Sequence, residues 1–269
     1  MKTKLFHSEW LQWQGEKLPT LVCLHGFTGT LNTFRSLNWP PNWNVLGVDL
    51  IGHGQSPIFV HPDEYRMPKV IQTLRNLMVK LGIGNYTVLG YSMGGRIALA
   101  WALSDPKIVR VILESSRPGI DSEQVRQERQ LKDNQLATRL LTQPLQAFVD
   151  DWENLPLFAT QRQLPAAVQA RVRKERLSQV PYGLAMSLMM LGTGQQANYW
   201  PRLPQICPGL LITGKVDAKF QGIATAMQKA APQLHHQVLP GGHCVHLENP
   251  ALFSQIISDY LNQRVSQVN

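Results

Sequence analysis

A serine flanked by glycines between a strand and a helix is the feature that most constrains this chain. Residues 86–89, Tyr-Thr-Val-Leu, predict a short buried strand, and residues 96–102 predict a helix. Between them lies the sequence Gly-Tyr-Ser-Met-Gly-Gly at positions 90–95. A sharp strand-to-helix turn brings two backbones into contact, so glycine is favoured where a side chain would collide. The pattern predicts that Ser92 presents its hydroxyl above the sheet, over the helix N-terminus.

Short apolar segments alternate with helical ones around this turn. A helix is expected over residues 70–81, and another from 251 to about 265. The expected strands cover residues 21–24, 44–49, 86–89, 109–114, 209–214 and 236–239. Such alternation is typical of a parallel sheet covered by helices on both faces. We therefore expect an α/β fold with a mostly parallel central sheet.

The alternation stops near residue 116 and resumes after about residue 204. The intervening sequence is polar, helical and rich in Gln and Arg. Asp121 and Ser122 can cap a helix that runs to about residue 141. Further helices are expected over 145–152, 166–178 and 182–191. We predict an α/β core made of residues 1–116 and 205–269, interrupted by a helical lid at 117–204.

Charge and cysteine content restrict the partners and the compartment. The net charge is +8, but the basic residues are scattered, so nucleic acid is not an expected partner. Part of the excess can serve an anionic small substrate. Three cysteines without metal-site spacing favour a reducing compartment, and we expect the cytoplasm. No apolar run reaches membrane-spanning length, and residues 1–5 lack the apolar stretch of a secretory signal.

Two later loops can complete a proton relay with Ser92. A serine hydroxyl becomes an effective base or nucleophile when an imidazole shares its proton and a carboxylate orients that imidazole. For a serine on such a turn, the expected chain order is Ser, acid, His. Asp217 follows the strand that ends at residue 214, and His243 follows the next strand after two glycines. We predict Ser92, Asp217 and His243 as the catalytic residues.

The assignments of Asp217 and His243 each have a competitor. Glu114, at the end of the strand after Ser92, is the main rival to Asp217 as the acid. His246 competes with His243, but it lies where the chain turns toward the last helix, so we interpret it as structural. Metal binding by the two histidines would need a third ligand, and none has convincing spacing. No metal is therefore expected.

Two backbone N–H groups are candidates for an oxyanion hole. One belongs to Met93, directly after the serine. The second is expected from the loop after the first core strand, His-Gly-Phe-Thr-Gly at 25–29, and we assign it to Phe27. A plain tight turn explains the same glycines, and the two interpretations are compatible.

Several arginines are candidates for binding an anion. Arg96 lies one turn after Ser92, and a cation near a helix N-terminus needs a compensating anion, either a protein carboxylate or a bound one. Arg129 has Asp133 four residues later as an ordinary partner. Arg176 stands on a helix with two other arginines that can form a solvated face. Trp152 can plug the lid or contact a ligand.

These segments together resemble the α/β-hydrolase superfamily, and within it the 2-succinyl-6-hydroxy-2,4-cyclohexadiene-1-carboxylate synthase family. The resemblance extends over essentially the whole chain. It rests on residues 25–29 and 90–96, on Pro118-Gly119, Asp151-Trp152 and Pro156-Leu157-Phe158, and on residues 176–178, 183–185, 192–196 and 200–201. Ser116-Arg117 departs from the family, whose members often have smaller or different residues there.

The resemblance implies a lyase of menaquinone or phylloquinone biosynthesis that needs no metal or organic cofactor. Its substrate would be a succinyl-bearing cyclohexene carboxylate with an enolpyruvyl ether, from which pyruvate leaves. Ser92 would act as a base through His243, and charge on the succinyl carbonyl oxygen would face the N–H groups of Phe27 and Met93. The positions that match substrate-contacting residues of the family are Tyr91, Arg96, Arg129, Trp152 and Arg176.

Two alternatives share the same sequence features. A carboxylester or carbon–carbon bond hydrolase uses the same three catalytic groups, because fold and triad do not determine the reaction. Such an enzyme needs an apolar acyl pocket rather than several cations. A ligand-binding receptor with this fold is the alternative outside enzymes, and an intact set of Ser, Asp and His argues against it.

Overall fold

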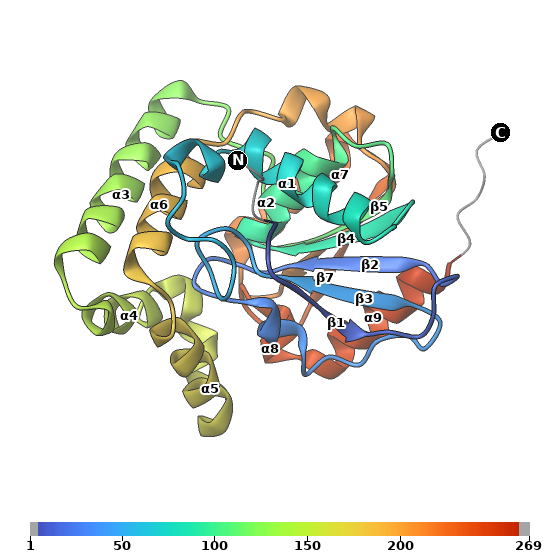
Figure 1. The fold of residues 1–269 in the computed structure, drawn as a ribbon, viewed down its shortest axis with the longest axis horizontal. Coiled ribbons are helices and arrows are strands. Elements are labelled where there is room, and N and C mark those ends of the chain that lie inside the picture. The colour runs from blue at the N-terminus through green and yellow to red at the C-terminus, as the bar shows by residue number, and fades with distance from the viewer. Residues whose placement is uncertain (1–4, 264–269) are drawn as a thin grey trace.

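The structure is a computed structural model that describes residues 5–263. A seven-stranded sheet runs through this part of the chain (Figure 1). The strand order is β1-β3-β2-β4-β5-β6-β7, and only β1 runs antiparallel to its neighbour. The strands are β1 (Ser8–Gln12), β2 (Thr20–Leu24), β3 (Asn44–Val48), β4 (Tyr86–Tyr91), β5 (Ile108–Glu114), β6 (Gly209–Gly214) and β7 (Leu234–Leu239). The predicted mostly parallel α/β sheet is confirmed, and β1 is the strand that the sequence analysis missed.

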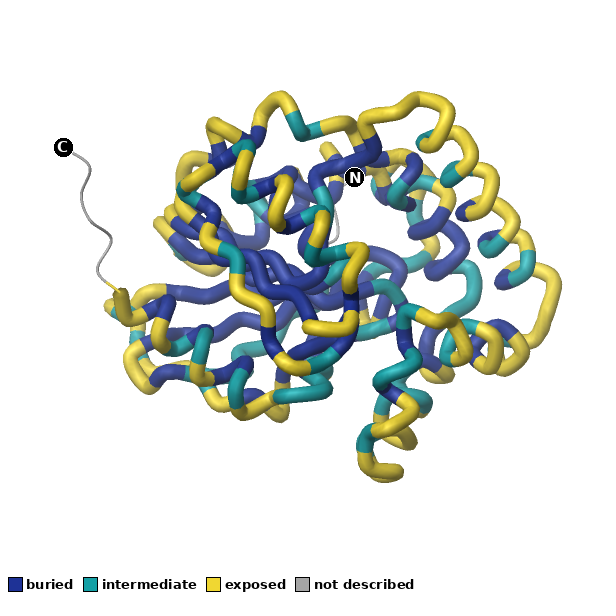
Figure 2. The backbone as a smooth tube through the Cα atoms, turned by 180° about the vertical axis from the view of Figure 1, so that it is seen from behind, coloured by how far each residue is buried: buried dark blue, intermediate teal, exposed yellow. Residues whose placement is uncertain are grey.

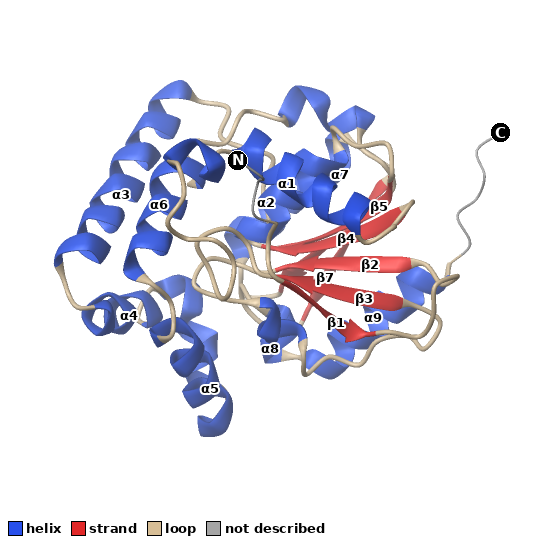
Figure 3. Cartoon of the chain, viewed as in Figure 1, coloured by secondary structure: helices blue, strands red, loops and turns tan. Residues whose placement is uncertain are grey.

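Helices cover both faces of this sheet (Figure 3). One face packs against α1 (Met67–Lys80), α2 (Met93–Ala102) and α7 (Ala218–Ala230). The other packs against η1 (Leu31–Phe34), α8 (Val245–Glu248) and α9 (Pro250–Asn262). The residues of β2, β3 and β4 are buried throughout, because a strand covered on both faces has no solvent side. Residue 265, where the last helix was expected to end, lies outside the described residues.

A group of helices is inserted between β5 and β6 and stands beside the carboxyl ends of the parallel strands. Its elements are α3 (Glu123–Thr142), α4 (Leu145–Glu153), η3 (Pro156–Gln163), α5 (Ala166–Leu177), α6 (Pro181–Leu191) and η4 (Trp200–Gln205). Ser122 caps α3 by accepting a hydrogen bond from the N–H of Val125 at 3.4 Å. The insertion has a small apolar core of its own around Leu140, Phe148 and Leu184.

The insertion is more exposed than the core. Figure 2 shows dark buried strands in the centre and long exposed stretches on the inserted helices. Arg176 is the buried residue of α5, a helix whose other side chains are exposed or half-buried. One short element of the core, η2 (Pro62–Tyr65), lies against α6. Within residues 5–263, the helices all fall short of the length and apolar character that a bilayer crossing requires.

Candidate active site

Ser92 lies at the turn from β4 to α2 in a strained backbone conformation, with φ 50° and ψ −104°. Positive φ is unfavourable for a residue with a side chain, so the surroundings must hold it in place. They do so by close packing, because a Cβ at Gly90 would collide with the Gly94 carbonyl, and one at Gly94 with the Leu24 carbonyl. The Ser92 N–H donates to the carbonyl oxygen of Glu114 at 2.9 Å. The glycine pattern thus produces the predicted turn.

The structure brings the three predicted catalytic side chains together in one hydrogen-bonded chain. His243 Nε2 lies 3.1 Å from Ser92 Oγ, and His243 Nδ1 lies 2.8 Å from Asp217 Oδ2. Asp217 also caps α7, because its Oδ1 accepts a hydrogen bond from the N–H of Phe220 at 3.3 Å. With both carboxylate oxygens engaged, Asp217 is fixed in the orientation that holds the imidazole toward the serine. His243 is 2 % exposed, so this contact is shielded from water.

Glu114 and His246, the two rivals, form a separate buried pair. Glu114 Oε2 lies 2.7 Å from His246 Nδ1, and Glu114 Oε1 accepts a hydrogen bond from the His246 backbone N–H at 3.0 Å. Both residues are completely buried. Glu114 therefore orients the segment that follows His243, while its own carbonyl accepts from Ser92. The expectation that His246 is structural agrees with this position.

Cys244 joins Glu114 and His246 in a cluster whose ligand atoms lie within 4.8 Å of one another. The sequence spacing did not indicate that these three would meet. The second ring nitrogen of His246 lies 2.7 Å from the Thr33 hydroxyl, so both nitrogens are engaged in hydrogen bonds. Burial raises the pKa of the Cys244 thiol, which keeps it in the form that is a poor metal ligand. The cluster is best described as a hydrogen-bonded support beneath the catalytic residues.

Replacing Glu114 by glutamine should lower the free energy of unfolding by about 1–3 kcal/mol, because a buried charge-assisted bond is lost. Burial opposes protonation of His246, but the hydrogen-bonded Glu114 carboxylate favours it, and the pKa of His246 is raised well above 6.5. A histidine whose folded pKa is raised contributes stability that is complete below about pH 6.5 and disappears as the pH rises through the folded pKa. The difference between wild type and Glu114→Gln, measured by urea unfolding, should therefore be larger at pH 6 than at pH 9.

The exposed Glu128 provides the matched control for this substitution. Glu128→Gln should change the free energy of unfolding by less than about 0.5 kcal/mol at either pH. An equal loss at pH 6 and pH 9 in the Glu114 variant would contradict the assigned charge state of His246.

The loop after β2 carries the predicted second oxyanion donor beside Ser92. Thr28 in this loop has a positive φ of 67°. In the described part of the chain, the backbone N–H groups of Phe27 and Met93 have no hydrogen-bond partner. Phe27, Ser92 and Met93 line the same pocket. Two unpaired donors beside the serine hydroxyl form an arrangement that can stabilise a developing negative charge.

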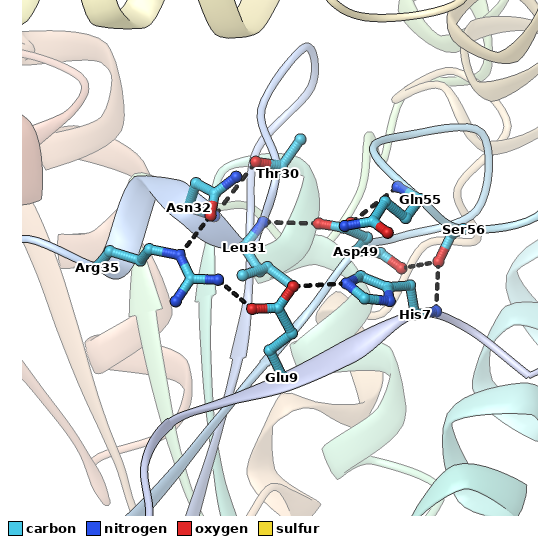
Figure 4. A network of polar contacts seen from close by, with 9 residues as sticks. All are labelled: His7, Glu9, Thr30, Leu31, Asn32, Arg35, Asp49, Gln55 and Ser56. Carbon is cyan, nitrogen blue, oxygen red and sulfur yellow. Dashed lines mark hydrogen bonds and ion pairs between the residues drawn. The ribbon is translucent and has the colours of Figure 1, made fainter.

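A network of polar contacts connects the end of the loop after β2 to the loop after β3 (Figure 4). Asp49, just past β3, accepts hydrogen bonds from the N–H of Leu31 at 2.8 Å and of Gln55 at 2.9 Å. The loops after β2 and β3 are thereby tied to each other. On the pocket side, the hydroxyl and N–H of Thr30 both donate to Glu175 of α5. The loop is thus fixed between the core and the insertion.

Arg96 is a buried cation at the pocket and lacks a carboxylate partner among residues 5–263. It is 7 % exposed, and its Nη1 donates to the Leu191 carbonyl at 3.0 Å. Burial, together with the nearby charges of Arg129 and Arg117, lowers its pKa to about 10. The sequence predicted either a protein carboxylate or a bound anion as the partner of Arg96. Since the described structure provides no protein carboxylate, a bound anion is favoured.

The other predicted substrate-binding residues also line this pocket. Arg129 pairs with Asp133 at 2.8 Å, as its ordinary interpretation required, and Arg176 pairs with Glu153 at 3.1 Å. Trp152 stacks on Phe148 with ring centroids 5.6 Å apart, and its buried indole N–H has no partner in the described structure. An unpaired buried donor at a pocket is available to a ligand.

Tyr91 occupies the pocket next to the serine, with its ring 4.9 Å from that of His246 and 5.6 Å from that of His243. Burial raises the pKa of its hydroxyl well above 10, so it remains a neutral hydrogen-bond donor. Lys219 and Glu175 line the pocket too, and sequence reasoning missed both. The position of Lys219, two residues after Asp217, was the available signal.

The comparisons with known proteins agree with this fold. Residues 19–250 match the family model described as alpha/beta hydrolase fold. The chain therefore belongs to the α/β hydrolase family.

Its similarity to particular members is greater. A protein of Bacillus subtilis (strain 168) is 37% identical over 245 residues, which cover 90% of this chain and 89% of that protein. It carries the provisional name 2-succinyl-6-hydroxy-2,4-cyclohexadiene-1-carboxylate synthase. The synthase of Klebsiella pneumoniae subsp. pneumoniae is 32% identical over 87% of this chain and 90% of its own. The solved structure of MenH from S. aureus matches with a TM-score of 0.87 and 35% identity, covering 95% and 97% of the two chains. The resemblance to this synthase family is confirmed, and the chain is a member of it.

Proposed function

We propose that the protein is a 2-succinyl-6-hydroxy-2,4-cyclohexadiene-1-carboxylate synthase, a lyase that eliminates pyruvate from 2-succinyl-5-enolpyruvyl-6-hydroxy-3-cyclohexene-1-carboxylate in menaquinone or phylloquinone biosynthesis. The observation that carries the proposal is a hydrogen-bonded Ser92–His243–Asp217 chain that opens into a pocket with the unpaired cation of Arg96. The family membership and the names of the relatives support the same reaction.

In this proposal the three catalytic groups move one proton. Ser92 Oγ abstracts a proton from the substrate ring while its own proton passes to His243 Nε2, and Asp217 stabilises the imidazolium. The electron pair of the broken C–H bond moves toward the succinyl carbonyl, whose oxygen faces the N–H groups of Phe27 and Met93. The pair then returns to form the ring double bond, and the carbon–oxygen bond breaks. The leaving group is the enolate of pyruvate, which takes the proton held by His243 and leaves as pyruvate, so the catalytic groups return to their starting state. The step requires neither a covalent enzyme intermediate nor a cofactor.

The substrate carries several carboxylates, which need fixed cations and donors. Arg96 is assigned to one of them because it is buried without an anion. Arg129 and Arg176 present the remaining guanidinium groups, and Tyr91 and Trp152 supply neutral donors at the same pocket. An ester hydrolase that accepts neutral acyl groups has no use for such a set.

The proposal includes a division of the chain and a location. Residues 1–116 and 205–269 form the catalytic core, and residues 117–204 form a lid that carries Arg129, Trp152 and Arg176. The position of these helices between β5 and β6 and the small apolar core that they share support this division. A cytoplasmic enzyme is proposed on the basis of the three free cysteines.

Pyruvate release by the purified protein tests the function directly. The pathway substrate is added, and pyruvate is followed by NADH oxidation with lactate dehydrogenase. Turnover that yields equimolar pyruvate and the cyclohexadiene product is expected. Hydrolysis of a neutral nitrophenyl ester without pyruvate release would favour a carboxylesterase, and ligand-dependent binding of a partner protein that Ser92→Ala leaves unchanged would favour a receptor.

A further inference from the structure

The basic residues that line the pocket differ in whether a carboxylate already neutralises them. Across residues 5–263, the pocket lining includes the cations Arg96, Arg129, Arg176 and Lys219. Asp133 pairs with Arg129, and Glu153 pairs with Arg176. Arg96 and Lys219 have no ion pair with the described residues. Two of the four positive charges are therefore left for an anionic ligand.

Lys219 is placed at the pocket by the same turn that places Asp217. Asp217 caps α7 through the N–H of Phe220, so Lys219 lies in the first turn of that helix. Its ammonium group lies 5.6 Å from the centroid of the Phe220 ring, which also lines the pocket. Arg96 occupies the corresponding first turn of α2 after Ser92. A cation beside the positive end of a helix is unfavourable unless an anion joins it, and here two such cations face one pocket.

Like charges from two parts of the chain surround Lys219. Its pKa is lowered by partial burial and then by the nearby charges of Arg117 and Arg129, although Asp217 acts in the opposite direction. The same two arginines lower the pKa of Arg96. Arg129 belongs to α3 of the insertion, whereas Arg96 and Lys219 belong to helices of the core. The positive charge is thus concentrated where the core and the insertion meet.

We propose that Lys219 is a substrate-binding residue and forms, with Arg96, a subsite for a dicarboxylate where the core meets the inserted helices. Its ammonium group would contact one carboxylate, while the buried guanidinium of Arg96 holds another. The proposal rests on the proposed function for its substrate, but the subsite itself requires only an anion with two carboxylates. A neutral or singly charged compound of the same size would gain less from it.

Lys219→Gln tests this role, with Lys215→Gln as the matched control and Lys219→Arg as the conservative variant. Lys215 lies in the same segment, is exposed and does not line the pocket. The KM for the pathway substrate should rise about five- to tenfold in Lys219→Gln, while kcat stays within about twofold, because Lys219 is exposed and an exposed ion pair contributes less than a buried one. Lys215→Gln should match wild type, and Lys219→Arg should recover most of the binding.

A second measurement does not depend on turnover. Binding of succinate as a simple dicarboxylate probe is followed by the shift in thermal unfolding. Its dissociation constant should rise about five- to tenfold in Lys219→Gln and remain unchanged in Lys215→Gln. If succinate binding depends on Lys219 but no pyruvate is released, the proposed function is contradicted and the subsite is supported. A Lys219→Gln variant that equals wild type in both KM and succinate binding overturns the role of Lys219, whatever the reaction proves to be.

Discussion

Ser92→Ala should reduce pyruvate release by roughly 10²–10⁴-fold or more, since the group that removes the ring proton is lost. The Oγ atom lies 3.1 Å from His243 Nε2, and no other hydroxyl is bonded to that nitrogen in the described structure. Substrate binding should be nearly unchanged, because the cations of the pocket remain in place. Rates from the coupled NADH assay and the KM for the substrate check both statements.

The double variant Ser92→Ala/His243→Ala distinguishes a relay from two independent contributions. Groups that act as a unit lose their effect together, so the double variant should be hardly slower than either single one. Ser104→Ala, at a serine bonded to the carbonyls of Ala100 and Trp101 away from the pocket, is the control and should retain wild-type turnover. Full activity in Ser92→Ala would refute the mechanism.

Arg96→Met should weaken substrate binding by roughly ten- to hundredfold, because charge-assisted hydrogen bonds are worth about 1.5–3 kcal/mol. Methionine keeps much of the buried stem and removes only the charged end. The same substitution should not lower the thermal unfolding midpoint. Among residues 5–263 this buried charge has no carboxylate within ion-pair distance, so removing it relieves an unfavourable arrangement.

Arg126→Met is the matched control for Arg96. Arg126 lies on α3 outside the pocket and pairs with Glu123 on the surface. Its loss should leave KM unchanged and should change the free energy of unfolding by less than about 0.5 kcal/mol. If Arg96→Met bound substrate as wild type does, Arg96 would have no role in carboxylate binding.

The parts of the fold that the sequence predicted are those specified by local pattern. Segments such as 86–89 and 209–214 are mostly apolar and lack alternating polar residues, which is typical of a strand covered on both faces, and both are buried throughout. Strand β1 was missed because residues 8–12, Ser-Glu-Trp-Leu-Gln, are mostly polar and half-buried at the edge of the sheet. Its pairing with β3 is decided by tertiary contacts, which a short segment does not encode.

The site shows the same division between local and distant information. The turn at Ser92 follows from neighbouring residues, so it was accessible to sequence reasoning. Asp217 was preferred to Glu114 from its place in the chain, but which histidine each carboxylate meets depends on distances across the sheet that no spacing reveals. Lys219 was overlooked because a single lysine early in a helix is ordinary until its charged neighbours are in view.

The position of the inserted helices in the sequence also affects how the protein folds during its synthesis on the ribosome. Strand β5 ends at residue 114, but its second neighbour, β6, begins only at residue 209. At typical synthesis rates of about 5–20 residues per second, the apolar edge of β5 waits on the order of 5–20 s for its partner. An unpaired edge of this kind invites association between nascent chains. Chaperone dependence should consequently be greatest while residues 115–208 emerge, before β6 can pair with β5.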